Sequence, residues 1–285
     1  MGDSPFPWLA PLLAMLLVFA IFPFFYNIYL SLHEFVPRQR ALVFVGLDNW
    51  AKLFTDERVW NATAVTFFYT AVCLAIQTSL GFAIALLLDS DGRGFGFLRG
   101  VLTLTLVIPP AITGMMFLLM EDAQFGVITW FLQSLGLLSP TAPILTTSST
   151  AIWGVILADV WQWTPFMVLI FVSGLRSLPT EPFESAMIDG ARPVQILWRL
   201  TLPMMGKVIA IAVLIRGIDL FRLFDYVYVM TSGGPGVATY TLSLYAWQQT
   251  FSFVKWGYGA TISLFTLIII LIVANLFIKF AKVRW

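Results

Sequence analysis

Long apolar stretches alternate with short charged segments along this chain. A helix needs about 20 mostly apolar residues to cross the hydrocarbon core of a bilayer, and lipid offers its backbone no other hydrogen-bonding partner. Each long stretch therefore predicts a membrane-spanning helix. Four stretches contain no Asp, Glu, Lys or Arg: residues 4–33, 59–88, 100–120 and 256–278.

Two further apolar stretches contain ionisable residues. Residues 151–175 contain Asp159. Residues 204–230 contain Lys207 near their start and, further along, Arg216, Asp219, Arg222 and Asp225. Charged groups at such depth are costly and usually face a bundle interior or a water-filled path. We therefore expect an all-α integral membrane protein with six transmembrane helices. Their approximate ranges are 8–32, 59–88, 100–120, 151–175, 204–230 and 256–279.

Composition supports this class and excludes several others. Of the 285 residues, 59% are hydrophobic and 11% are charged, whereas an average soluble domain has roughly 25% charged residues. A net charge of +1 provides no basic field for nucleic acid. One cysteine, Cys73, and one histidine, His33, exclude a disulfide scaffold and a Cys/His metal cluster. No metal site is expected.

The connecting segments predict the orientation. An even number of spans places both termini on one side, and cytoplasmic N and C termini agree with the positive-inside rule. The basic residues would then lie inside at Arg93, Arg99, Arg176, Arg192, Arg199, Lys207, Lys279, Lys282 and Arg284, and outside at Arg38, Arg40, Lys52, Arg58 and Lys255.

The segment at about 178–203, between the fourth and fifth predicted spans, has the most informative local pattern. It predicts a short helix, a turn and a second short helix, because Gly190 can take a left-handed conformation and Pro193 can open a helix. Phe183 and Ala186 recur at helical spacing and give the first helix an apolar face. An apolar, acid-tipped helix in a cytoplasmic loop is suited to docking into a groove on a soluble partner.

This segment resembles the EAA loop of binding-protein-dependent ABC importer permeases, usually written EAA, two residues, DGA and a final Leu-Pro. The pattern stands here as Glu184-Ser185-Ala186, Asp189-Gly190-Ala191 and Leu202-Pro203. It departs at three positions: Ser185 replaces an Ala, and Leu197 and Leu200 stand where Phe and Ile are usual. The Asp-Gly-Ala form is typical of the sugar-importing branch.

Three further elements extend the resemblance over most of the chain. They are WQWTPF at 161–166, similar to the W-x-x-TPF element of sugar permeases; residues 216–235, similar to their fifth span and its Gly-Gly-Pro exit; and FVGLDNW at 44–50, similar to their F-x-G-L-x-N-[YF] loop. With the EAA loop, these elements have the order and spacing of the family. The chain is identified as a member of the maltose/glycerol-phosphate permease-like family.

The resemblance implies a type I importer (MetI-like) permease fold, with residues 1–285 as a single transmembrane domain in the bacterial inner membrane. It also implies a second homologous permease, two ATP-binding cassette subunits that grip the EAA loop, and a periplasmic binding protein that delivers a sugar or sugar derivative. The chain contains no GxxxxGK followed by Ser or Thr. We therefore expect ATP and Mg²⁺ on the partner ATPase subunits, no cofactor on this chain, and no enzymatic activity of its own.

The resemblance and the local chemistry assign ATPase coupling to Glu184, Ser185, Ala186, Asp189, Gly190 and Ala191. Small residues would let the loop approach the partner closely, and the carboxylates could pair with basic groups on the ATPase. A purely structural role is the alternative, in which Glu184 caps its helix and Gly190 makes the turn.

The substrate pathway is predicted along the fifth span. Arg222, Asp225 and Tyr228 offer the hydroxyl-matching polar groups and aromatic faces that a sugar site needs. On a continuous helix the four charges, each three residues apart, would spiral and pair with their neighbours. Asp159 and nearby Trp163 are the second candidate lining. Two alternatives remain: a self-neutralised structural ladder, and a role for Asp159 as a buried partner of the fifth span.

Other functions are also open at this point. The chain could be an ABC permease for a non-sugar solute, an ion-coupled secondary transporter that uses the charged fifth span, or a receptor whose loop recruits a partner. Six predicted spans without an evident inverted repeat, together with the loop at 178–203, favour the ABC permease over the secondary transporter.

Overall fold

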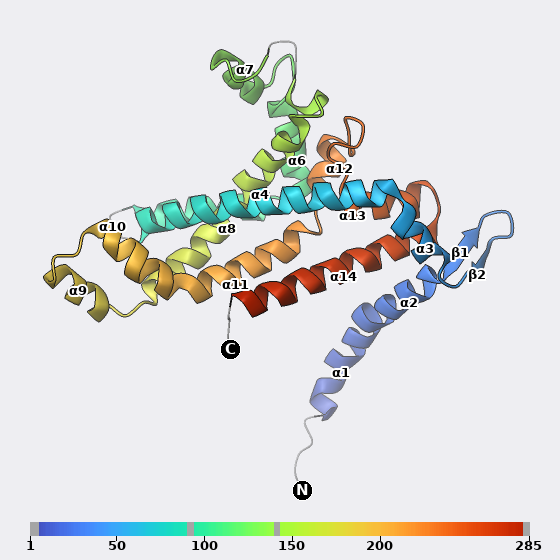
Figure 1. Ribbon diagram of the computed structural model, residues 1–285, viewed down its shortest axis with the longest axis horizontal. Coiled ribbons are helices and arrows are strands. Elements are labelled where there is room, and N and C mark those ends of the chain that lie inside the picture. The colour runs from blue at the N-terminus through green and yellow to red at the C-terminus, as the bar shows by residue number, and fades with distance from the viewer. Residues whose placement is uncertain (1–5, 90–93, 140–142, 282–285) are drawn as a thin grey trace, which may run out of the picture. The chain divides into compact units, whose positions relative to one another are not determined.

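The computed structural model describes residues 6–89, 94–139 and 143–281 (Figure 1). Arg93, Lys282 and Arg284, which enter the orientation prediction, lie outside these residues. Contacts divide the chain into two compact units, Met1–Thr63 with Leu242–Ile269, and Ala64–Thr241 with Ile270–Trp285. Each unit is described by itself.

Five helices in the described chain are long and apolar enough to cross a membrane. They are Leu9–Ser31, α4 (Glu57–Leu88), α8 (Ala151–Arg176), Pro193–Leu220 and α14 (Trp256–Phe280). A sixth candidate is a bent pair, α5 (Phe95–Val107) and α6 (Pro110–Met120), whose axes differ by 96°. The prediction of a helical, multi-pass membrane fold is confirmed.

The bend in the third predicted span has a local cause. Ile108 and Pro109 are extended between the two helices, since a residue before proline avoids the helical region, and Pro110 begins α6. The freed carbonyl of Ile108 accepts a hydrogen bond of 2.6 Å from the side-chain amide of Gln162 in α8. The span is therefore broken at a point where another helix satisfies its backbone.

The fifth predicted span ends earlier than expected. α11 (Leu202–Leu220) is followed by a turn and then by the short helix α12 (Asp225–Met230). In the break, the hydroxyl of Thr241 donates to the carbonyl of Leu223 at 3.1 Å. One helix through Met230, with four charges spiralling around it, was therefore a wrong prediction. Asp225 instead stands in the first turn of α12, where the helix dipole favours a carboxylate.

The first unit contains a hairpin that the sequence pattern did not predict. Helical segments α1 (Phe6–Leu16), Leu17–Ile21 and α2 (Phe22–Ser31) lead into strands β1 (His33–Val36) and β2 (Ala41–Phe44), and then into α3 (Asp48–Thr55). The strands are antiparallel, with His33 opposite Phe44. The side-chain amide of Asn49 donates to the carbonyls of Ser31 and His33, both at 3.0 Å, and so fixes the start of the hairpin. The unit also contains α13 (Leu242–Trp247), the π-helical turn Gln248–Ser252 and the start of α14.

In the second unit α4, α8 and α11 pack together through a buried apolar cluster that includes Ala85, Met167, Phe171 and Met205. Gly81 allows the closest approach, because a Cβ atom there would lie 2.7 Å from Cβ of Met167. Such small-residue contacts are typical of packed membrane helices. The remaining described elements are α7 (Val127–Ser134), the 3₁₀ turn Ile144–Thr146, α9 (Glu181–Ile188), α10 (Pro193–Ile196) and the π-helical turn Leu197–Thr201.

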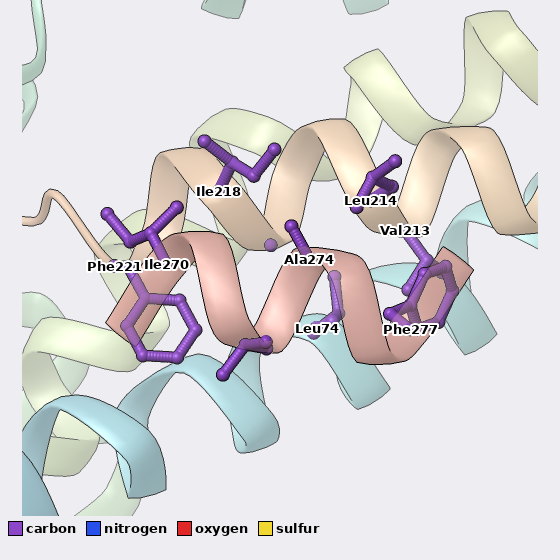
Figure 2. A pocket seen from close by; sticks show the side chains of 10 residues that line it. Leu74, Val213, Leu214, Ile218, Phe221, Ile270, Ala274 and Phe277 are labelled. Carbon is purple, nitrogen blue, oxygen red and sulfur yellow. The ribbon is translucent and has the colours of Figure 1, made fainter. Parts of the chain in front are cut away.

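A small apolar cavity remains between α4, α11 and α14. Figure 2 shows its lining side chains, among them Leu74 from α4, Val213 from α11 and Phe277 from α14. Its volume is about 70 Å³ and its walls are almost entirely carbon. A void with no polar partner for water is a gap in packing and offers no site for a polar substrate.

The close approach at Gly81 predicts a large effect of a single methyl group. Gly81→Ala should lower the melting temperature by about 5 °C, because overpacking costs roughly 1–3 kcal/mol. The control is Gly206→Ala in α11, where an added Cβ meets nothing within 4 Å. We expect that variant to match or exceed the wild-type melting temperature, since alanine favours helix. Equal melting temperatures for the two variants would contradict the close packing of α4 on α8.

Candidate substrate pathway and coupling loop

Arg216, four residues before the end of α11, is the centre of a buried ionic cluster. Its side chain is 2% exposed. One guanidinium nitrogen is paired with Asp159 of α8, and another is paired with Asp219, one turn further along α11. A buried charge needs both a counter-charge and hydrogen bonds to compensate for lost hydration. Two carboxylates around one guanidinium supply this compensation.

Gln77 of α4 completes the cluster. Its side-chain carbonyl accepts from Nε of Arg216 at 2.9 Å, while its amide nitrogen donates to the carboxylate of Asp159 at 2.6 Å. Gln77 is fully buried and Asp159 is 2% exposed. Three helices, α4, α8 and α11, are therefore joined by one closed set of ion pairs and hydrogen bonds.

Aromatic residues extend the cluster toward α12. The guanidinium of Arg216 lies over the ring of Trp163, 4.7 Å from its centroid, in the geometry of a cation–π contact. The indole nitrogen of Trp163 donates to the hydroxyl of Tyr226 at 3.1 Å, and that hydroxyl donates to Gln162. Because the side-chain amide of Gln162 also donates to the carbonyl of Ile108, the cluster is linked to the bend in the third predicted span.

A cavity of about 70 Å³ lies beside this cluster. Four of the five residues predicted for the pathway line it: Asp159, Trp163, Arg222 and Asp225. Tyr228 does not. It is 41% exposed and stacks on Phe224, with ring centroids 5.1 Å apart. Small-molecule pockets have volumes of roughly 300–1,000 Å³, so this cavity is too small to enclose a sugar.

The sequence interpretation missed three polar members of this site: Gln77, Gln162 and Tyr226. None of them carries a charge at neutral pH, so a search for ionisable residues in apolar stretches passes over them. A search for amides within predicted spans would have found the two glutamines. The alternative role for Asp159, as a buried partner of the fifth span, agrees with its ion pair to Arg216.

The predicted coupling loop forms the expected helix–turn–helix. α9 ends at Ile188, and Gly190 follows with a φ of +74°. The amide of Gly190 donates to the carbonyl of Met187 at 3.1 Å, and the amide of Ala191 donates to that of Ala186 at 2.9 Å. These two bonds form a Schellman motif, which requires a left-handed residue at the position of Gly190. Pro193 then opens α10, as the sequence predicted.

The loop presents most of its predicted coupling residues to solvent. Glu184, Ser185, Asp189 and Gly190 are exposed, while Ala186 and Ala191 are half-buried. Beside them, Met187 is 60% exposed and Ile188 is 86% exposed. Large apolar side chains next to exposed carboxylates form a surface that is suited to a protein partner.

Glu121, directly after α6, is a buried carboxyl group that the sequence interpretation did not single out. It is 1% exposed, and neither of its carboxyl oxygens has a hydrogen-bond partner among the described residues. The carboxyl lies against Gly154 of α8. Burial raises the pKa of Glu121 to about 8, so this side chain is mostly neutral at pH 7.

Five membrane-length helices in the described part of the chain and an ion-paired cluster between three of them, together with an exposed helix–turn–helix, define a multi-pass membrane protein. The sequence profile of one family, described as "Binding-protein-dependent transport system inner membrane component", matches residues 77–283. This match covers more than half of the chain. The protein belongs to that family of permease subunits, as the sequence motifs indicated.

Several relatives are similar over nearly the full length. The trehalose/maltose transport permease MalF of Thermococcus litoralis is 34% identical, and the match covers 96% of this chain and 92% of the relative. The trehalose permease SugA of Mycobacterium tuberculosis is 31% identical over 96% and 87% of the two chains. The sulfoquinovosyl glycerol permease SmoG of Agrobacterium fabrum is 27% identical over 96% and 88%.

Solved structures agree on the fold. A chain of a bacterial alginate ABC transporter, crystallised with an alginate pentasaccharide-bound periplasmic protein, superimposes with a TM-score of 0.81. That match covers 97% of this chain and 93% of the other chain at 19% identity. A chain of the MetNI methionine ABC transporter matches with a TM-score of 0.53, 18% identity and coverage of 82% and 95%. The predicted ABC importer permease fold is confirmed.

The ionic cluster predicts unequal costs of removing two carboxylates. Asp159→Asn should lower the melting temperature strongly, because breaking a buried ion pair costs about 3–5 kcal/mol. Asp225→Asn is the control, since Asp225 is an exposed acid beside the same cavity. Its melting temperature should stay within a few degrees of wild type. Equal melting temperatures for the two variants would contradict the role of Asp159 as the counter-charge that stabilises buried Arg216.

The state of Glu121 predicts a pH dependence of stability. An acid whose pKa is higher in the folded than in the unfolded protein binds more protons when folded, so stability falls as pH rises. The loss of stability occurs between pH 4.5, the ordinary pKa of a glutamate, and about pH 8, the pKa of Glu121 in the folded protein. The difference in melting temperature between Glu121→Gln and wild type should therefore be about 5 °C more favourable to the variant at pH 8 than at pH 5. Glu57→Gln, a change at an exposed site, should show no such gain, and an unchanged pH profile in Glu121→Gln would contradict the buried neutral state.

Proposed function

We propose that this protein is the transmembrane subunit of an ATP-driven importer that carries a sugar or sugar derivative across the bacterial inner membrane. The exposed turn at the end of α9 is the observation that carries the proposal. It holds an Asp-Gly-Ala sequence in a fixed Schellman motif and exposes Met187 and Ile188 beside two carboxylates. The cargo class is supported by the relatives that bear names of trehalose, maltose and sulfoquinovosyl glycerol transport.

The proposed assembly contains a second homologous permease, two ATP-binding cassette subunits and a periplasmic binding protein. The binding-protein-dependent family and the likeness to transporter chains support these partners. ATP and Mg²⁺ bind to the cassette subunits, which hydrolyse ATP. The present chain performs no covalent chemistry and binds no cofactor in this proposal.

Coupling depends on contact between α9 and the ATPase. The apolar side chains of Met187 and Ile188 enter a groove on that partner, and Glu184 and Asp189 pair with basic groups at its rim. Gly190 holds the turn that presents them, because its positive φ is costly for residues with a Cβ. ATP binding then moves the loop, and the pathway opens alternately to the two sides.

For the cargo, we propose contacts from Arg222, Asp225 and Tyr228. All three are exposed, and charged and aromatic groups match the hydroxyls and apolar faces of a sugar. Asp159 and Trp163 act through Arg216, which they hold in place. The cavity beside them must enlarge before a sugar can pass, since its volume is about 70 Å³.

The test is reconstitution of the whole importer in liposomes with its binding protein. ATPase stimulation is screened across neutral and anionic sugars, and uptake of the stimulating sugar is then measured. Stimulation by one glycoside is the expected result. A well-assembled complex that no sugar stimulates would remove the cargo assignment and leave the permease assignment in place.

Coupling is tested by two matched variants in α9. Glu184→Gln should reduce uptake about tenfold with the subunits still assembled, because it removes one charge-assisted contact of about 1.4 kcal/mol. Glu181→Gln removes another exposed carboxylate of the same helix, outside the EAA pattern, and should leave uptake unchanged. Equal uptake by the two variants would contradict a coupling role for Glu184.

A further inference from the structure

The first unit contains a polar cavity that the proposed transport function does not use. Its volume is about 360 Å³. The walls come from the end of α3, the start of α4, the π-helical turn at 248–252 and the start of α14. A space of this size suits a small polar molecule or the head group of a larger one.

Three basic side chains line the cavity: Lys52, Arg58 and Lys255. Among the residues that the structure describes, none of the three forms an ion pair. Nζ of Lys52 lies 4.3 Å from the ring centroid of Tyr258, another residue that lines the cavity. Three cations in one wall, none of them in a described ion pair, favour an anionic occupant.

The one acid in the wall, Asp56, is already satisfied by the protein. Its carboxylate accepts hydrogen bonds from the hydroxyls of Tyr245 and Tyr258, each at 2.6 Å, and from the amide of Arg58 at 2.9 Å. Burial opposes its charge, but these bonds outweigh burial and lower the pKa of Asp56. The acid is an anion held by the protein, and three cations against this one charge leave the wall positive.

Gln249 gives the cavity a second kind of recognition. This side chain is 5% exposed, and its Oε1 atom has no hydrogen-bond partner among the described residues. A buried carbonyl oxygen without a donor is costly, and such groups in native structures call for an explanation. A hydroxyl group of an occupant would supply the missing donor. The cavity therefore offers positive charge for an anion and a free acceptor for a hydroxyl.

The position of the cavity indicates where its occupant comes from. It lies at the amino-terminal ends of α4 and α14, two of the membrane-spanning helices, whose dipoles add positive potential there. Trp60 and Trp256, near the starts of these helices, are 48% and 36% exposed. Tryptophans at span ends are typical of the membrane–water interface, the depth at which lipid head groups lie.

We propose that this cavity binds a phosphate ester with free hydroxyl groups, supplied as the polyol-phosphate head group of a membrane lipid. Lys52, Arg58 and Lys255 bind the phosphate, and Oε1 of Gln249 accepts a hydrogen bond from a head-group hydroxyl. Phosphatidylglycerol has both groups. Phosphatidic acid has the phosphate without the polyol, and phosphatidylcholine has neither a net charge nor a hydroxyl.

The experiment measures lipids retained by the full chain, purified with the subunits that accompany it, by native mass spectrometry in the presence of each of the three lipids. Wild type should retain phosphatidylglycerol over phosphatidylcholine. Arg58→Gln with Lys255→Gln should reduce phosphatidylglycerol retention about a hundredfold, since two charge-assisted contacts of about tenfold each are lost. The matched control is Arg38→Gln with Arg40→Gln, which removes two exposed cations from the hairpin of the same unit. Equal retention by the two double variants would overturn the site.

A second variant tests the hydroxyl contact. Gln249→Leu should abolish the preference for phosphatidylglycerol over phosphatidic acid while phosphatidic acid is still retained at the wild-type level. An unchanged preference would overturn the role of Gln249. Variants are compared only if their melting temperatures match wild type, and Gln249→Met, which also lacks the amide acceptor, replaces any Gln249→Leu protein that melts early.

The source of the phosphate ester is tested by adding soluble glycerol 1-phosphate to the complex after it has been delipidated and reloaded with phosphatidylglycerol. We expect it to displace phosphatidylglycerol only weakly, because it lacks the acyl chains that keep a head group at the interface. Displacement at equal concentration would overturn the lipid assignment and would identify a site for a free polyol phosphate.

Discussion

The fold of the second unit depends on the way in which one buried charge is neutralised. Arg216 lies at a depth where water is not available to solvate it, so the protein must supply a counter-charge and hydrogen bonds from neighbouring helices. Asp159 of α8 and Gln77 of α4 do so, and Asp219 of α11 itself adds a second counter-charge. Because these partners come from three different helices, the arginine can be satisfied only when the helices are correctly placed. A polar requirement thus specifies the packing of an otherwise apolar bundle.

The same requirement connects parts of the molecule that are far apart in sequence. Trp163 contacts the guanidinium of Arg216 and the hydroxyl of Tyr226, and Tyr226 contacts Gln162, which binds the break between α5 and α6 at Ile108. The backbone at Ile108 would otherwise lose a hydrogen bond inside the membrane. The bend in the third span and the end of the fifth span are therefore stabilised by one continuous set of polar contacts.

Local rules made the coupling loop predictable. Gly190 takes a left-handed conformation at the turn, and Pro193 stands at the first position of a helix, as each residue type favours. The end of α11 at Leu220 was not predictable in this way, because its break is satisfied by Thr241, which is distant in sequence. The bend at Ile108 was predictable only in part. Its prolines are visible in the sequence, but composition alone counts them as part of one apolar stretch.

The remaining gaps in prediction concern neutral polar side chains. Gln77 and Gln162 look unremarkable within apolar stretches, and only long-range contacts give them their roles. Asp159 and Arg216 were recognisable as unusual, but their pairing depends on which faces of α8 and α11 meet. A charge inside a span therefore predicts that a partner exists, and tertiary structure alone identifies the partner.

The helix that follows the coupling loop has a mechanical consequence. Pro193–Leu220 forms one helical span of 28 residues, about 42 Å long at 1.5 Å per residue. Its first turn adjoins the Asp-Gly-Ala turn, and Arg216 lies four residues before its other end. A tilt of about 5° at the loop end would displace the guanidinium, about 35 Å away at 1.5 Å per residue, by about 3 Å, which is enough to break an ion pair. When this span moves as one unit, a displacement at the loop end reaches Arg216, whose ion pairs are then either kept or exchanged.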